Sequence, residues 1–261
     1  MNSDSRKGRE MSVSLGTIIK ELRIKKGYTQ NDLAEGICSL KQLSRIENNQ
    51  SEASTYILSE FSFRLGEDLM DYIPYADLEE PFLWRERLEQ LEWHYHQEHF
   101  SALYESAKKW KNDPVVEESV FIKQRIYWYH GIAACYCKEE DAYGVEDFLS
   151  LIRMTHPFEK VEDLWRFNLK PYEIRVLNSA IYVLLNEGKY DVAEEWMIAL
   201  IEMFERCYYE IKDYTYLKVI YNLSRLYLQR KEYRKAIEFA DKGIHLCKKI
   251  IFSIDLKTFV I

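Results

Sequence analysis

Two short helical patterns, separated by a few small residues, restrict the fold of this chain most strongly. They are Thr29-Gln-Asn-Asp-Leu-Ala-Glu35 and Lys41-Gln-Leu-Ser-Arg-Ile-Glu47, with Gly36-Ile-Cys-Ser39 between them. Thr29 and Asp32 have approximately the spacing of a capping box, which places the start of the first helix. Helices joined this closely must cross steeply, so the stretch predicts a helix-turn-helix.

The two patterns predict a small shared core and one exposed polar face. The core residues are Leu33, Ala34, Ile37, Leu43 and Ile46. The outward face of the second helix carries Leu40, Lys41, Gln42, Ser44 and Arg45. Lys and Arg can donate to guanine O6 and N7, Gln can pair with adenine, and Leu can contact a thymine methyl group. The face is therefore suited to reading base edges, although exposed Lys and Arg are also common on ordinary surfaces.

A longer motif surrounds this face. It reads L-G-x-x-I-K-x-L-R-x-x-K-G-Y-T-Q-x-D-L-A, then L-S-R-I-E-N, then a helix ending in R-L-G. Residues 15–72 thus resemble the five-helix helix-turn-helix domain of the Cro and phage-repressor (XRE) family, with a shorter turn at Cys38-Ser39. The resemblance implies a DNA-binding domain in which Arg23 and Gln30 hold phosphates. The residues expected at the duplex are Arg23, Gln30, Ser39, Leu40, Lys41, Gln42, Ser44 and Arg45.

Charge and composition divide the chain. The first 50 residues carry nine Lys and Arg against six Asp and Glu, a net charge of +3, whereas the whole chain carries −7 and the remainder therefore −10. A DNA backbone attracts the first part and repels the second, so DNA binding is expected only in the N-terminal domain. With nine Gly, five Pro and no long period-two alternation, the chain reads as all-α. No signal peptide or membrane-length apolar run is evident, which favours the cytoplasm.

We expect four segments along the chain. Residues 1–13 are predicted to be a flexible arm and residues 14–73 the helix-turn-helix domain. Residues 74–81, between two prolines, are the predicted linker, and residues 82–261 the helical repeat domain. This division follows from the change from the motif region to a long series of helical patterns.

The C-terminal part contains weak repeats. Each has a long helix, a charged or Gly-containing turn, and an aromatic residue that opens a second helix. These residues are Phe100, Tyr143, Tyr190 and Tyr233, which lie 43, 47 and 43 positions apart. The pattern resembles tetratricopeptide (TPR) repeats, whose helix pairs stack into a curved solenoid with a concave groove. An all-α chain with an N-terminal helix-turn-helix and a TPR-like α-solenoid is therefore predicted.

Two asparagines mark the inner helices of these repeats. Asn178 and Asn222 lie 44 residues apart, one repeat. Amides in register along a groove can donate to and accept from the backbone of an extended peptide. They can equally cap or bridge neighbouring helices. The peptide-binding residues predicted with them are Tyr129, Arg175, Tyr182, Lys218, Tyr221 and Arg225.

The two parts together are similar to the peptide-pheromone-responsive transcription regulators of Gram-positive bacteria, the Rgg, NprR, PlcR and PrgX group. The PlcR-like branch is the most similar, through Ile37-Cys38, Ser44-Arg-Ile-Glu47 and the asparagine-bearing helices. The resemblance implies quorum sensing by a homodimer that binds an inverted-repeat operator in double-stranded DNA. It also implies that Asn178 and Asn222 hold the main chain of a short signalling peptide. Family members usually finish with a further helical pair, whereas this chain ends on the apolar stretch 252–261.

We expect neither catalysis nor a cofactor. No nucleophile motif or phosphate-binding glycine loop is present. His96 and His99 could converge on one helix face, but no third ligand accompanies them, so no metal site is expected. Two other functions remain open. The chain could be a peptide-blind repressor whose repeats serve dimerisation, or its repeats could bind a protein partner.

Overall fold

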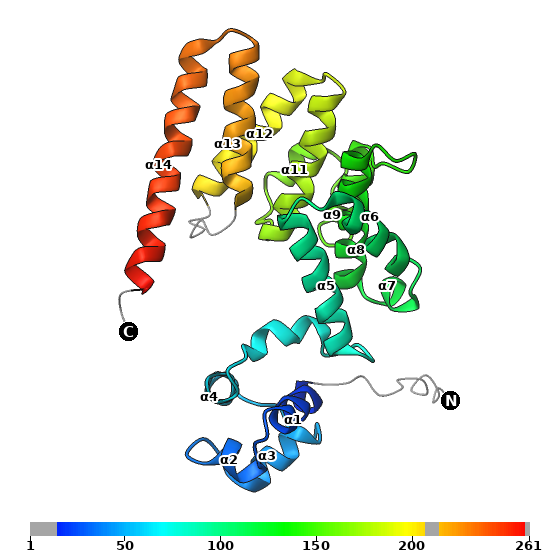
Figure 1. The fold of residues 1–261 in the computed structure, drawn as a ribbon, viewed down its shortest axis with the longest axis vertical. Coiled ribbons are helices and arrows are strands. Elements are labelled where there is room, and N and C mark those ends of the chain that lie inside the picture. Colours follow the sequence, from blue (N-terminus) through cyan, green and yellow to red (C-terminus); the bar gives the residue numbers. More distant parts are fainter. Residues whose placement is uncertain (1–14, 207–213, 259–261) are drawn as a thin grey trace, which may run out of the picture. The chain divides into compact units, whose positions relative to one another are not determined.

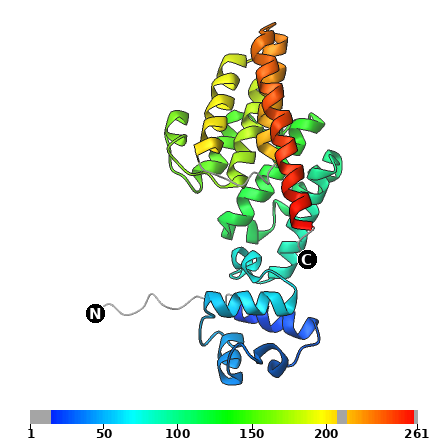
Figure 2. The ribbon, with the colours of Figure 1, turned by 90° about the vertical axis from the view of Figure 1, so that its left-hand side faces the viewer.

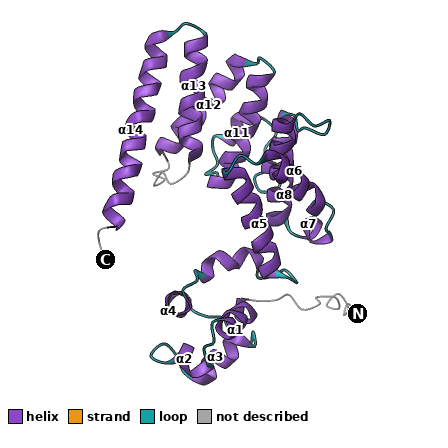
Figure 3. Ribbon diagram, in the orientation of Figure 1, coloured by secondary structure: helices purple, strands orange, loops and turns teal. Residues whose placement is uncertain are grey.

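The computed structural model describes residues 15–206 and 214–258, with side chains described for residues 15–206 and 215–248. Every regular element in these ranges is helical, which confirms the all-α prediction (Figure 3). The predicted arm, residues 1–13, and the side chains of the terminal stretch 252–261 lie outside the described residues. Contacts divide the chain into two compact units, residues 1–99 with 112–125 and residues 100–111 with 126–261.

The first unit contains the predicted five-helix domain. Its elements are α1 (Leu15–Lys25), α2 (Gln30–Ala34), α3 (Leu40–Glu47), α4 (Thr55–Leu65), the 3-10 helix η1 (Leu69–Tyr75), α5 (Pro81–His96) and α7 (Pro114–Glu118). The predicted fifth helix is thus a 3-10 helix. Within the predicted linker, residues 74–81, η1 ends at Tyr75 and α5 begins at Pro81.

Side-chain caps place the starts of α2, α3 and α4. The Thr29 hydroxyl accepts from the Asp32 amide at 3.2 Å, and the Asp32 carboxylate accepts from the Thr29 amide at 2.8 Å. This is the predicted capping box. Hydrogen bonds from the Thr29 hydroxyl and then its amide lower the pKa of Asp32. Ser39 and Ser54 cap α3 and α4 in the same way.

The core of this domain forms where α1, α2, α3 and α4 meet. Its members include Ile18, Ile19, Leu22, Leu33, Ala34, Leu43, Ile46, Ile57, Leu58, Phe61 and Leu65. All five predicted core residues take part, with Ile37 partly buried against the cluster. Gly16 allows α1 to approach α3, because a Cβ atom there would lie 1.9 Å from the carbonyl oxygen of Ile46.

The second unit is a series of antiparallel helices. Its elements are α6 (Phe100–Trp110), α8 (Val120–Cys137, from Ile126 onward), α9 (Val145–Arg153), α10 (Val161–Leu164), α11 (Pro171–Asn186), α12 (Tyr190–Arg206), α13 (Tyr214–Gln229) and α14 (Tyr233–Thr258). Contacts run from α9 to α11, from α11 to α12, from α12 to α13 and from α13 to α14. Figures 1 and 2 show α13 and α14 side by side, with α14 much the longer. The successive packing confirms a solenoid-like arrangement.

The turns predicted to separate the paired helices share one backbone conformation. Glu98, Lys138, Gly188 and Lys231 follow the ends of α5, α8, α11 and α13, and all four have positive φ angles of 56–74°. The next amide then bonds to a carbonyl five residues earlier, as in Lys189 to Leu184 and Glu232 to Tyr227, both at 2.9 Å. This is a Schellman-type ending, which satisfies the last carbonyls of each helix.

Candidate nucleic-acid interface and peptide-binding residues

Helix α3 exposes the face that the sequence predicts to read DNA. Ser39, Leu40, Lys41, Gln42 and Arg45 are exposed, and Ser44 is half-buried. Leu40 has half of its surface exposed although it is a large apolar residue. On the opposite side, Leu43 and Ile46 are buried in the domain core. Burial of these two residues fixes the orientation of α3 about its own axis, and in this orientation Lys41, Gln42 and Arg45 face solvent.

Side-chain hydrogen bonds cap both ends of α3. At the start, the Ser39 hydroxyl accepts from the Gln42 amide at 3.2 Å. At the end, the Asn48 amide group donates to the Ser44 carbonyl oxygen at 2.8 Å. Asn49 then has a φ of 59°, the left-handed conformation expected for this turn. Lys41 and Arg45 thus lie on a rigid short helix between two defined caps.

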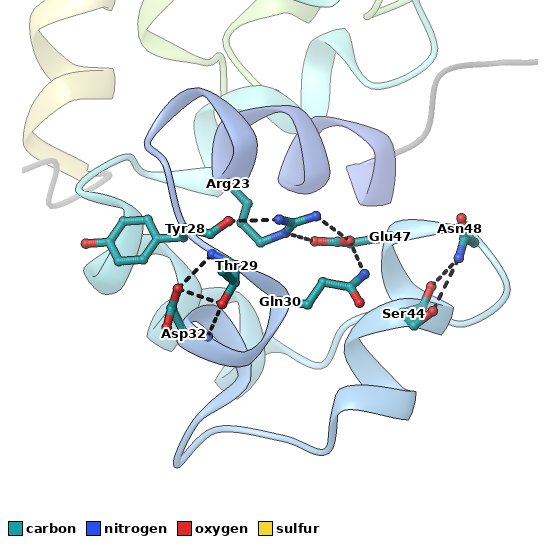
Figure 4. A network of polar contacts seen from close by, with 8 residues as sticks. All are labelled: Arg23, Tyr28, Thr29, Gln30, Asp32, Ser44, Glu47 and Asn48. Carbon is teal, nitrogen blue, oxygen red and sulfur yellow. Dashed lines mark hydrogen bonds and ion pairs between the residues drawn. The ribbon is translucent and has the colours of Figure 1, made fainter.

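A buried ion pair lies behind this helix (Figure 4). Arg23 Nε donates to Glu47 Oε1 at 2.5 Å and Arg23 Nη2 donates to Glu47 Oε2 at 3.1 Å. Arg23 Nη1 also donates to the Tyr28 carbonyl oxygen at 2.8 Å, and Gln30 Nε2 donates to Glu47 Oε2 at 2.6 Å. The network joins α1, the start of α2 and the end of α3. A bidentate ion pair of this kind holds the guanidinium and the carboxylate in one relative orientation.

These contacts change the interpretation of two predicted DNA-contact residues. Arg23 is buried, and its guanidinium group bonds within the chain. Gln30 is half-buried and donates to the same carboxylate. Their observed role is structural, and phosphate contacts by either residue stay a prediction. Glu47, their shared partner, carried no assigned role in the sequence analysis. Its position one helical turn after the buried Leu43 is the signal that could have shown it to be buried.

Arg64 is a second residue to which the sequence analysis assigned no role. Its Nη1 atom, on α4, donates to the carbonyl oxygens of Asp32, Leu33 and Glu35 at 2.9, 3.2 and 2.6 Å. These carbonyls lie at the end of α2, where the helix leaves them without partners. Arg64 therefore holds the first helix of the helix-turn-helix from its C-terminal end.

The predicted peptide-binding residues fall into three classes of exposure. Lys218, Tyr221 and Arg225 are exposed, Asn178, Asn222, Arg175 and Tyr182 are half-buried, and Tyr129 is buried. The Asn178 Oδ1 atom is buried and has no hydrogen-bond partner among the described residues. Such an atom is costly unless a donor reaches it. The helices that carry the two asparagines, α11 and α13, contact each other.

Aromatic contacts bring some of these residues together and separate others. Tyr182 stacks on Tyr136 of α8 with ring centroids 4.8 Å apart, and Tyr136 stacks on Phe100 at 3.9 Å. On α13, the Arg225 guanidinium lies 5.6 Å from the Tyr221 ring. Tyr129 instead packs at 4.6 Å against the buried Trp128. Tyr182 and the Tyr221–Arg225 pair therefore remain available as surface groups, whereas Tyr129 belongs to the core.

Residues 19–69 match a family model described as Helix-turn-helix. These residues form a helix-turn-helix domain. The matched range runs from Ile19 in α1 to Leu69 at the start of η1, so it contains α2, α3 and α4 entirely. Helix α3, with its exposed polar face, is the second helix of the helix-turn-helix in this domain. No curated protein matches the sequence.

The fold of this chain is similar to that of PlcR from Bacillus thuringiensis, solved in complex with the peptide PapR7 and DNA. The TM-score is 0.69 at 18% identity over 92% of this chain and 81% of PlcR. ComR from S. thermophilus, in complex with DNA and its signalling peptide ComS, gives 0.37 at 16% identity over 92% and 95%. The SHP pheromone receptor Rgg2 from Streptococcus dysgalactiae gives 0.37 at 11% over 94% and 97%. The similarity to PlcR shows a common fold.

Two properties of the described residues bear on other functions. Each helix there is too short or too polar to cross a lipid bilayer. In the same residues, no group of three or more His, Cys, Asp and Glu side chains is arranged to hold a metal ion. His96 instead pairs with Glu92 at 2.9 Å, and His99 packs against Trp93.

Proposed function

We propose that this chain is a cytoplasmic, sequence-specific DNA-binding transcription regulator controlled by a short linear peptide. The observation that carries the DNA-binding part is the exposed face of α3 in a helix-turn-helix domain. Lys41, Gln42 and Arg45 lie there as donors, and Leu40 is an exposed apolar group beside them. These are the chemical types that contact base edges in the major groove.

The proposed DNA interface consists of the side chains that are exposed or half-buried on α3. It therefore contains Ser39, Leu40, Lys41, Gln42, Ser44 and Arg45. Two such helices in a homodimer would read an inverted repeat, with half-sites about 34 Å apart or a multiple of this distance. The net charge of −10 outside the first 50 residues supports a duplex contact confined to the N-terminal domain.

The peptide-binding part rests on the second unit. Its fold is shared with PlcR, whose structure contains both a peptide and DNA. Asn178 supplies a buried oxygen atom without a donor, and Asn222 lies one repeat further on a contacting helix. A backbone N–H of an extended peptide satisfies such an acceptor whatever the peptide's side chains. The peptide regulates DNA binding to the extent that it favours one arrangement of the dimer over another.

Two in vitro selection experiments, one on DNA and one on peptides, test this proposal with the full chain. Selection from random double-stranded DNA is expected to enrich an inverted repeat, and selection from random heptapeptides is expected to enrich a peptide that changes affinity for that repeat. Affinity for scrambled DNA equal to that for the selected repeat contradicts the DNA-reading part. A selected DNA site together with no peptide-dependent change in its affinity identifies a peptide-blind repressor instead.

A further inference from the structure

The last helix of the second unit exposes an apolar stripe. Tyr233, Ile237 and Ile244 of α14 have 58%, 62% and 54% of their surface exposed, and Ala240 and Cys247 are also exposed. Along the sequence these five residues are separated by 4, 3, 4 and 3 positions. That spacing is the a and d pattern of a coiled-coil helix, which places all five side chains in one line.

This stripe is distinct from the face that packs on α13. Up to Lys248, where its side chains are described, α14 buries Ala236 and Leu246. Gly243 lies on the same side, where a Cβ atom would come within 3.4 Å of the Ile220 side chain of α13. A surface helix is expected to turn a polar face outward. Among the described side chains, α14 instead exposes the apolar stripe to solvent, so we expect a further helix to cover the stripe.

The backbone of α14 continues beyond the stripe. The helix reaches Thr258, and with 26 residues it is about 39 Å long, whereas α13 has 16 residues. The stripe from Tyr233 to Cys247 spans two heptads, and the helix that carries it is long enough for a helix pair formed between chains.

We propose that the covering helix is α14 of a second copy of this chain, in antiparallel orientation. The charges beside the stripe select this occupant. In the heptad that places Ile237 and Ile244 at a, the e positions with described side chains are Arg234, Asp241 and Lys248, which alternate in sign. In antiparallel pairs e faces e of the partner helix. One register puts Asp241 opposite the partner's Lys248, and the two-fold axis makes this contact twice.

The other registers are disfavoured by the same residues. A shift by one heptad in one direction brings Asp241 opposite its own copy and Arg234 opposite Lys248, and a shift in the other direction brings Lys248 opposite its own copy. Both place like charges together. In a parallel pair, e faces g, and the g positions with described surroundings, Ala236 and Gly243, carry no charge. Among the described positions of α14, the antiparallel register that pairs Asp241 with Lys248 is the one that brings opposite charges together.

A charge-swap experiment on the full chain tests this register. Asp241→Lys and Lys248→Asp are each expected to raise the dimer dissociation constant at least about tenfold, since each creates two like-charge contacts across the two-fold axis. The double variant restores opposite charges and is expected to return dimerisation to near the original value. Glu238→Lys makes the same charge change at an exposed b position and is the control. Sedimentation equilibrium gives the constants, and circular dichroism checks that helix content is retained.

Each outcome decides the proposal. Recovery in the double variant supports it. Weakened dimers in both single variants without recovery overturn the antiparallel register, and unchanged dimers in all variants place the interface elsewhere. A monomeric parent chain at micromolar concentration also overturns it, as does an Ile244→Asp variant that stays folded and dimeric. The inference rests on the dimer in the proposed function, but the two can fail separately. If dimerisation weakens in both single variants and recovers in the double variant while the chain binds no DNA, the proposed function is wrong and this interface stands.

Discussion

The Nη1 atom of Arg64 lies 2.6 Å from the carbonyl oxygen of Glu35, at the end of the first helix of the helix-turn-helix. A charged donor shared by several terminal carbonyls stabilises a five-residue helix that has little stability of its own. We expect Arg64→Ala to lower the free energy of unfolding of this domain by roughly 1.5–3 kcal/mol. Urea unfolding measures the loss, with the exposed Ser59→Ala on the same helix as the control. Equal stability of the two variants would contradict the capping role.

Gly16 is expected to tolerate no side chain. A Cβ atom at this position meets the backbone of Ile46, which cannot rotate away, so α1 and α3 must separate. We expect Gly16→Ala to destabilise the domain by more than about 2 kcal/mol, although Ala normally favours a helix over Gly. Lys20→Ala, at an exposed position on the same helix, is expected to have little effect. Thermal unfolding of the two variants gives the comparison.

Arg45 is expected to contribute directly to operator recognition. Its side chain is exposed on α3, so Arg45→Ala leaves the domain core intact. We expect a loss of roughly 1–3 kcal/mol in binding to the selected DNA and a smaller loss on scrambled DNA. Fluorescence anisotropy at one fixed salt concentration measures both. Equal losses on the two DNAs would assign Arg45 to the phosphate backbone instead of the bases.

Asn178 and Asn222 are expected to act together in peptide binding. The double variant Asn178→Ala with Asn222→Ala removes both amides, so we expect peptide binding to be abolished while DNA binding persists. Isothermal titration with a selected heptapeptide measures the first, and anisotropy with DNA the second. Gln229→Ala, an exposed amide at the end of α13, is the matched control. Unchanged peptide affinity in the double variant places the peptide elsewhere.

Lys231 has a left-handed backbone that a glycine adopts at lower cost. At the equivalent turn after α11 the chain already has a glycine, Gly188. Lys231→Gly is therefore expected to stabilise the second unit by about 0.5–1 kcal/mol, and Gly188→Ala to destabilise it by about 1 kcal/mol. Urea unfolding followed by circular dichroism shows both changes. A loss of stability in Lys231→Gly would mean that contacts of the lysine side chain outweigh the backbone term.

Local sequence signals were enough to predict much of the first unit. Thr29 and Asp32 form the expected capping box, and the apolar spacing of Leu33, Leu43 and Ile46 gives the observed core. Such features depend on residues close together along the chain, so periodicity and capping rules reveal them. The same rules predicted the outward face of α3.

The contacts that the sequence did not reveal connect distant residues. Arg23 and Glu47 are 24 positions apart, and the family resemblance implied a phosphate contact for Arg23 because the sequence alone does not show its carboxylate partner. Tyr129 shows a related limit: its position on α8 does not tell which face of that helix the rest of the unit buries. The left-handed Glu98 and Lys231 were missed because propensity favours Gly or Asn there.

The solitary oxygen of Asn178 also has a consequence for ligand chemistry. In the proposed site the folded chain buries a hydrogen-bond acceptor that has no donor, which lowers its stability. Binding offsets this cost only when the ligand places an N–H group at that oxygen. A peptide with proline or an N-methylated residue at that point has no hydrogen to offer. The receptor would therefore reject such peptides by backbone chemistry, even where their side chains fit.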